Sequence, residues 1–150
     1  MSSQANTVPN DPELAKLIAR VESNNDFRAM RFEPATFQMI SNRPVTSALT
    51  KIIENNHVSL ATARVIYSTS WGAFQIMGFN LYSLGFEGHI IDFANLPSLQ
   101  LVAFNWFLDA NHINWKLSDI MADDNKLRMF AVAYNGSDAY AARMKQFYKP

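Results

Sequence analysis

The chain has 150 residues, 49% of them hydrophobic and 17% charged, a length and composition that favour one globular domain with one core. Thirteen basic residues balance thirteen acidic ones, and no apolar run approaches the roughly 20 residues of a membrane span, so we expect neither a nucleic-acid partner nor a membrane span. The chain contains no cysteine, which excludes disulfides, thiolate zinc sites and cysteine nucleophiles.

The first ten residues are mostly polar, and we expect residues 1–10 to form a flexible leader before a single domain over residues 11–150. The leader lacks the basic segment followed by an apolar segment that is typical of a secretory signal peptide. We therefore expect no signal peptide.

A helix is predicted directly after the leader, because Asp11 can cap it and Pro12 suits its first position. Its apolar residues recur at helical spacing and are Leu14, Leu17, Ile18 and Val21. The polar run of residues 23–26 breaks this spacing, so the helix should end near Glu22.

The middle of the chain is irregular at first and then helical. Residues 27–44 contain Pro34, Asn42 and Pro44, which predicts a loop or short hairpin region that could include one helical turn. Apolar positions at helical spacing predict helices over about residues 47–55 and 59–67. We also expect a short helix over residues 72–78.

The last third of the chain is predicted to be helical. Residues 96–111 should form a deeply buried helix whose apolar face carries Leu99, Val102, Ala103, Trp106 and Phe107. Asp123 and Asp124 can cap another helix, which stops at Asn135 and Gly136. Ser137 or Asp138 then caps a final helix to about residue 148. These elements together predict a mainly α fold.

Glu22 continues one edge of the buried stripe at the point where the first helix ends. A partly desolvated carboxyl there would have a raised pKa, which suits a general acid that holds a proton near neutral pH and delivers it to a leaving group. A solvated or salt-bridged glutamate fits the same position. The choice depends on the motifs that accompany it.

Three motifs accompany Glu22, namely "VESNN" at residues 21–25, "SWGAFQIMG" at 70–78 and "AYNG" at 133–136. Their order and spacing resemble the lysozyme-like superfamily. With "RFEPATF" and the longer run "TSWGAFQIMGFNLYSLGF", the chain resembles the phage-type N-acetylmuramidase domains of endolysins, from about residue 14 to 148. The resemblance implies a lysozyme-like, mainly α domain with minimal β structure over residues 11–150.

The resemblance also implies an activity and a set of site residues. It implies hydrolysis of the β-1,4 bond between N-acetylmuramic acid and N-acetylglucosamine in peptidoglycan, with Glu22 as the catalytic acid. The candidate substrate-binding residues are Ser70, Gln75, Tyr134 and Asn135. A sugar cleft needs apolar walls and a few placed amides, and Gln75 could be such an amide. The same residues equally fit structural roles: Tyr134 as core packing and Asn135 as a helix C-cap.

Hydrolysis by the usual scheme needs a second carboxylate, about 5 Å away for a retaining enzyme and about 6.5 to 9.5 Å for an inverting one. We favour Glu33, in the "RFEP" element, over Asp26, which suits a turn. Pairing of Glu33 with Arg28 or Arg31 is the competing interpretation. Without a second carboxylate, Glu22 could act alone as in a lytic transglycosylase, which forms an anhydromuramoyl product. A glycan-binding phage module without turnover is a third hypothesis.

No metal or cofactor is expected. His57, His89 and His112 are far apart and lack the spacing of metal ligands, and no serine lies in a nucleophile motif. The expected partner is the glycan strand of peptidoglycan, bound by a monomer. With no signal peptide expected, a phage enzyme of this kind would stay in the host cytoplasm until the membrane is permeabilised, and then act on the cell wall.

Overall fold

The computed structural model describes residues 11–148, so the predicted leader over residues 1–10 lies outside the described residues. Short and medium helices dominate, with a three-stranded antiparallel sheet in the order β1–β2–β3. The helices are α1 (Pro12–Ser23), α2 (Pro34–Ser41), α3 (Ser47–Asn56), α4 (Leu60–Tyr67), α5 (Gly78–Ser83), α6 (Ile90–Asn95), α7 (Pro97–Ala110), α8 (Leu117–Ala122), α9 (Asp124–Asn135) and α10 (Tyr140–Phe147). The strands are β1 (Met30–Phe32), β2 (Thr69–Trp71) and β3 (Ile76–Met77).

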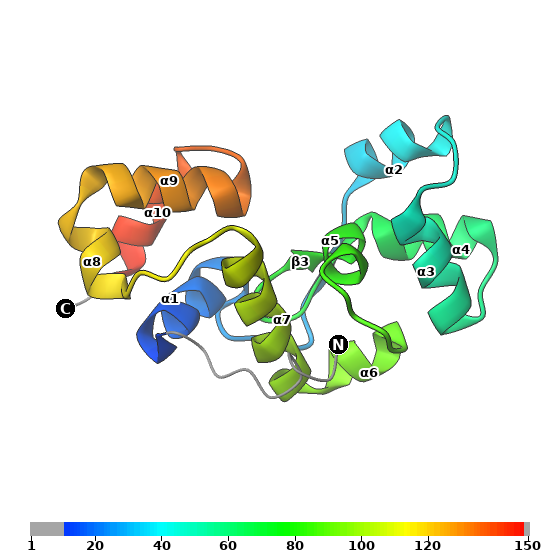
Figure 1. Ribbon diagram of the computed structural model, residues 1–150, viewed down its shortest axis with the longest axis horizontal. Coiled ribbons are helices and arrows are strands. Elements are labelled where there is room, and N and C mark those ends of the chain that lie inside the picture. Colours follow the sequence, from blue (N-terminus) through cyan, green and yellow to red (C-terminus); the bar gives the residue numbers. More distant parts are fainter. Residues whose placement is uncertain (1–10, 149–150) are drawn as a thin grey trace.

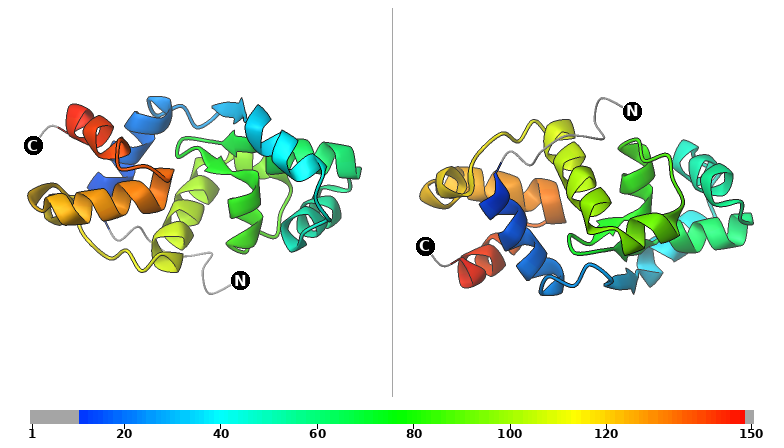
Figure 2. Two further views of the ribbon diagram at one scale, coloured as in Figure 1. Left: turned by 90° about the horizontal axis from the view of Figure 1, so that it is seen from above. Right: turned by 90° about the horizontal axis from the view of Figure 1, so that it is seen from below.

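The molecule is elongated, with two groups of helices on either side of α7 (Figure 1). One group joins the two ends of the described chain, because α1 packs on α10, α10 on α9 and α9 on α8. The other group holds α2 to α6. The sheet and α7 lie between these groups in the views from above and below (Figure 2). The predicted mainly α, lysozyme-like fold is confirmed.

α7 is the central helix, and its burial confirms the expectation for residues 96–111. Ala103, Phe104 and Trp106 are buried in the core. The buried face differs from the predicted one, because Leu99, Val102 and Phe107 are only half-buried. Gln100, Phe104, Asn105 and Leu108 are buried instead. A helix between two packed groups is covered on more than one face, so its sequence cannot show a clean amphipathic period.

Several helix ends follow the predicted capping. The Asp11 side chain accepts from the amide of Glu13 at the start of α1. Asp123 caps α9 by accepting from Asn125 and Lys126. Gly136, with φ of 80°, is the C-cap of that helix, so Asn135 is its last helical residue and not the cap. The final helix begins later than predicted, with Ala139 at its N-cap position.

The predicted short helix over residues 72–78 is wrong. Strands β2 and β3 form a hairpin there, with Ser70 opposite Met77 and Trp71 opposite Ile76. Gly72 (φ 81°) and Gln75 (φ 52°) both adopt the left-handed conformation, which a helix cannot contain and a tight turn requires. A glutamine gives no sequence signal for a positive φ.

The irregular segment 27–44 is more structured than predicted. It contains β1, which pairs with β2, and the eight-residue helix α2. Pro34 is the reason that α2 begins where it does, since proline suits the first helical position. The six-residue helices α5, α6 and α8 were not predicted, because so few residues show no clear period.

Candidate active site

Glu22 lies in the last turn of α1, where the chain reverses sharply. Asn24 (φ 55°) and Asn25 (φ 65°) are both left-handed, and their amides donate to the carbonyls of Arg20 and Ala19, both at 3.1 Å. Asparagine tolerates this conformation better than most residues, so the "SNN" run ends the helix directly after the glutamate. The half-buried Glu22 side chain is thus held at a fixed helix end.

Burial raises the pKa of the Glu22 carboxyl above its ordinary value of 4.5. The Tyr140 hydroxyl, and then the positive charges of Arg143 and Arg31, oppose this shift because they stabilise the charged form. The net direction is upward. A carboxyl with a raised pKa retains its proton over a wider pH range, as a general acid requires.

Two tyrosines lie close to Glu22. Burial and the adjacent Glu22 charge raise the pKa of both Tyr134 and Tyr140, so both phenols stay protonated at neutral pH. The Tyr140 hydroxyl is buried and interacts with the Glu22 carboxyl, although with the described residues it forms no hydrogen bond of normal geometry. Tyr140 therefore has a donor available to the carboxyl.

Arg143 comes from α10 and reaches back to the end of α1. Its Nη2 donates to the carbonyl oxygen of Val21 at 2.9 Å, and its guanidinium lies 5.7 Å from the centroid of the Tyr140 ring. This anchorage holds a positive charge beside Glu22. Neither Tyr140 nor Arg143 was predicted as a site residue, because nothing in the sequence indicates that α10 packs on α1.

The hairpin turn at residues 72–75 is tied to three other elements through its backbone. The Ser23 hydroxyl, from α1, donates to the carbonyl of Ala73 at 2.8 Å. The Gln100 carboxamide oxygen, from α7, accepts from the amide of Ala73 at 2.9 Å. The Tyr134 hydroxyl, from α9, donates to the carbonyl of Phe74. The turn is therefore fixed relative to the helix end that carries Glu22.

Gln100 is the buried centre of this arrangement, with 1% of its surface exposed. Its Nε2 donates to the carbonyl oxygens of Phe27 at 2.8 Å and Phe93 at 3.0 Å. A Cβ on Gly72 would lie 2.5 Å from the carboxamide carbon of Gln100, so glycine is required for this close approach. Gln100 was missed by the sequence analysis, although a lone glutamine within an apolar helix is the same kind of signal as Gln75.

Ser70 and Gln75 are brought together, but they bond to one another. Ser70 is 3% exposed, and its hydroxyl donates to Oε1 of Gln75 at 2.7 Å. Nε2 of Gln75 donates to the carbonyl of Gly72 at 3.0 Å. These bonds close the hairpin and use the polar atoms predicted to meet substrate. Their role as substrate contacts stays a prediction.

Tyr134 and Asn135 occupy different environments at the end of α9. The ring of Tyr134 stacks on Phe130 at 5.7 Å and its hydroxyl reaches the hairpin, so both the packing and the site interpretations describe it. Asn135 is exposed. Its predicted contact with substrate is untested.

Glu33 is engaged by an arginine. Nε of Arg31 donates to its Oε1 at 2.7 Å, and 31% of the Glu33 side chain is exposed. The positive charge of Arg31 also opposes the upward shift in the pKa of Glu22, so one arginine interacts with both carboxyls. Asp26 accepts from the amide of Arg28, as expected for a turn residue. The assignment of Glu33 as the second carboxylate stays a prediction.

Among residues 11–148, no group of three histidines, aspartates or glutamates is placed to hold a metal ion. Within the same residues, no helix is long and apolar enough to cross a membrane.

The fold and this site define a small lysozyme-like domain, with a desolvated glutamate at a helix end beside a clamped β-hairpin. A family model described as N-acetylmuramidase matches residues 54–150. The endolysin of Enterobacteria phage PRD1 is 41% identical over 129 residues, which cover 83% of this chain and 87% of that protein. No solved structure matches the chain significantly.

The chain belongs to the N-acetylmuramidase family and is a phage endolysin-type muramidase domain. Peptidoglycan-degrading activity follows from this membership, as does the cell wall as its target. The family match contains the hairpin and the "AYNG" motif but begins after Glu22 and Glu33. The family match therefore leaves the roles of those two glutamates as predictions.

Proposed function

We propose that this domain hydrolyses the β-1,4 bond between N-acetylmuramic acid and N-acetylglucosamine, with Glu22 as the general acid. The observation that carries the proposal is the desolvation of the Glu22 carboxyl at a helix end beside the clamped hairpin. A carboxyl that keeps its proton can protonate the glycosidic oxygen while the bond to the anomeric carbon breaks. A water molecule then attacks that carbon to complete hydrolysis, and the proton it releases restores the protonated Glu22 carboxyl.

Glu33 is the proposed second carboxylate. It can either attack the anomeric carbon or accept a proton from the attacking water, and its separation from Glu22 in the substrate complex would decide between retention and inversion. Its Oε1 accepts from Nε of Arg31 at 2.7 Å, which holds the side chain in place. Glu33→Gln should therefore abolish most turnover while the protein still binds peptidoglycan.

The four proposed binding residues divide into three that stabilise the hairpin and one that is exposed. Ser70 and Gln75 shape the hairpin, since their polar groups bond within it. Tyr134 fixes the turn through Phe74. Asn135 is exposed and available for a sugar hydroxyl or N-acetyl group. Asn135→Ala should then raise KM, whereas Gln75→Ala should lower both stability and kcat.

The ion pair of Glu33 also supports a second candidate reaction. If Arg31 keeps Glu33 away from the substrate, Glu22 works alone, and the C6 hydroxyl of the muramoyl residue attacks its own anomeric carbon. Glu22 protonates the leaving oxygen and then accepts the hydroxyl proton. The product carries a 1,6-anhydro ring instead of a reducing end, so the two reactions leave chemically distinct termini.

Mass spectrometry of the soluble products distinguishes the candidates. Purified peptidoglycan is digested, and the products are treated with borohydride. Reducible N-acetylmuramic acid ends support hydrolysis, and anhydro ends that resist reduction identify a transglycosylase. A protein that binds peptidoglycan and releases no soluble product would instead be a binding module.

We further propose that the domain acts as a monomer without a metal or cofactor, because proton transfer and positioning supply the chemistry. As a phage enzyme, it would remain in the host cytoplasm until the membrane is permeabilised. Chelation with EDTA should leave its activity on purified peptidoglycan unchanged.

A further inference from the structure

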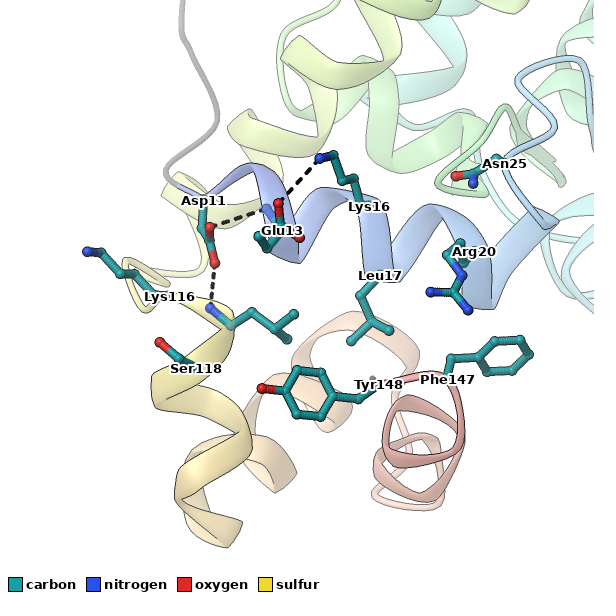
Figure 3. A pocket seen from close by; sticks show the side chains of 11 residues that line it. Asp11, Glu13, Lys16, Leu17, Arg20, Asn25, Lys116, Ser118, Phe147 and Tyr148 are labelled. Carbon is teal, nitrogen blue, oxygen red and sulfur yellow. Dashed lines mark hydrogen bonds and ion pairs between the residues drawn. The ribbon is translucent and has the colours of Figure 1, made fainter. Parts of the chain in front are cut away.

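A cavity of about 470 Å³ opens between α1, α8 and α10 (Figure 3). Its size falls within the range of small-molecule sites. Glu13 lines the cavity and precedes Glu22 by nine residues. At about 100° per residue, the two side chains therefore point in roughly opposite directions around the axis of α1. The cavity therefore faces the side of α1 opposite Glu22.

The cavity combines aromatic and apolar walls. The Tyr148 ring lies beneath α1, below Leu17, and its hydroxyl end points toward Ser118 (Figure 3). Phe147 borders the same space, and both rings are half-buried, each with one side packed on the core. A half-buried aromatic face beside polar groups is the surface on which the flat face of a pyranose can pack.

The anionic groups of the cavity wall already have partners. One oxygen of Asp11 accepts from the amide of Leu117 at 2.6 Å, and the other accepts from the amide of Glu13 at 3.2 Å. The Glu13 carboxylate pairs with Lys16 at 3.3 Å. Backbone donors and one lysine thus satisfy both carboxylates.

Two cations of the cavity wall form no ion pair within the described part of the chain. Arg20 and Lys116 line the cavity, and neither forms an ion pair with any residue from 11 to 148. The Arg20 side chain points toward Phe147, whereas Lys116 lies at the other end of the cavity (Figure 3). The cavity therefore has a net attraction for a negative charge beside an aromatic wall.

We propose that this cavity binds an anionic saccharide unit of peptidoglycan, with a pyranose face on Tyr148 and a carboxylate on Arg20. The inference rests on the proposed function, which supplies peptidoglycan as the substrate. A glycan held on the side of α1 opposite Glu22 keeps the enzyme on the cell wall between cleavage events. Because the cleavage site and this cavity share no side chain, either can be altered without the other.

Binding can be measured by NMR in the Glu22→Gln protein, so that cleavage does not consume the ligand. The probes are the neutral dimer of N-acetylglucosamine, the disaccharide of N-acetylglucosamine and N-acetylmuramic acid, and the same disaccharide with its stem peptide. We expect the amides of Leu17, Ser118 and Tyr148 to shift with a carboxylate-bearing probe. A response to the disaccharide that is lost in the peptide form assigns the free lactyl carboxylate. A response to the peptide form assigns a carboxylate of the stem peptide, because the lactyl carboxyl is then in an amide bond.

Two outcomes would overturn the inference. Equal shifts with the neutral dimer would show that the cavity does not select a negative charge. Shifts confined to residues around Glu22 and the hairpin would show that the cavity is not a site.

Variants test the same inference on intact sacculi. In the Glu22→Gln background, Arg20→Gln with Tyr148→Ala should weaken sedimentation with sacculi by about tenfold, because the double variant removes both the cation and the aromatic ring. Tyr148→Phe should retain binding, and Arg128→Gln, on the exposed face of α9, is the charge-matched control. Unchanged binding by the double variant contradicts the inference. Release of soluble products by wild type, measured separately, shows whether the proposed function itself stands.

Discussion

The hydroxyl of Ser23 donates a hydrogen bond of 2.8 Å to the carbonyl oxygen of Ala73, fifty residues further along the chain. This bond joins the residue after Glu22 to the turn of the β-hairpin. The amide of the same residue, Ala73, donates to Oε1 of Gln100 at 2.9 Å. The backbone of Ala73 therefore connects the hairpin turn both to the end of α1 that carries Glu22 and to α7.

Ser23→Ala should lower kcat more than it lowers stability. The hydroxyl donates to the carbonyls of Ala73 and Ala19 and accepts from the amide of Asp26, and each hydrogen bond contributes about 1 kcal/mol to the free energy of unfolding. A loosened turn in addition shifts the hairpin beside Glu22. Urea unfolding and muropeptide release measure the two effects. Ser41→Ala is a control, because within the described part of the chain its hydroxyl bonds only inside α2, to the carbonyl of Phe37 at 2.6 Å. Equal losses of kcat in both variants would contradict the role of the Ser23 bond.

Gln100→Leu should destabilise the protein by about 3 kcal/mol or more. The leucine leaves the amide of Ala73 and the carbonyl of Phe27 without partners in a buried region, and each unsatisfied group costs about 1 to 3 kcal/mol. The free energy of unfolding in urea is the measurement. The exposed Gln38 of α2 gives the control Gln38→Leu, expected to change stability by less than about 0.5 kcal/mol. A small effect at Gln100 would show that water replaces its bonds.

Glu22→Gln should stabilise the protein at neutral pH. Burial raises the pKa of Glu22 in the folded state above the ordinary value of 4.5, so ionisation is harder in the folded chain than in the unfolded chain. The folded state is favoured in full below pH 4.5, and this advantage is lost as pH rises through the folded-state pKa. The neutral glutamine avoids the loss.

Thermal or urea unfolding of wild type and Glu22→Gln across pH 4 to 8 tests this linkage. The stability gap should widen in favour of the variant as pH rises, and then level off above the folded-state pKa. A gap that does not change with pH would show that the Glu22 carboxyl is not desolvated. Glu54→Gln, on the exposed side of α3, is the control for loss of a surface carboxylate.

Tyr140→Phe should raise the pKa of Glu22 further, because the phenol hydroxyl stabilises its charged form. The alkaline limb of the activity profile should then move to higher pH, since the general acid keeps its proton longer. A carboxyl-carbon NMR titration of Glu22 measures the shift directly. Tyr67→Phe, in α4, should leave the titration unchanged. A downward shift in Tyr140→Phe would contradict the assigned contact.

Local signals in the sequence predicted much of the helical framework and the position of Glu22. Caps at Asp11 and Asp123 and the apolar spacing in α1, α7 and α9 depend on neighbouring residues, so they are visible along the chain. The hairpin was mistaken for a helix because the positive φ of Gln75 is imposed by its bonds to Gly72 and Ser70. Those bonds exist only in the folded chain.

The candidate site was only partly visible in the sequence, for a similar reason. The motifs drew attention to Glu22, Gln75 and Tyr134, whereas Tyr140 and Arg143 act on Glu22 only because α10 packs against α1. Long-range packing has no local signature. Gln100 is the site residue that the sequence could have indicated, because a glutamine stands out within the apolar segment of α7.

We propose that Glu22 donates the proton that cleaves the glycan. The most direct measurement is the initial rate of soluble muropeptide release by Glu22→Gln and wild type, compared at equal concentrations of folded protein. Glutamine keeps the shape but has no acidic proton, so the account predicts a rate loss of about a hundredfold to ten-thousandfold with sacculus binding retained. A variant that still releases muropeptides at a rate near that of wild type would contradict it.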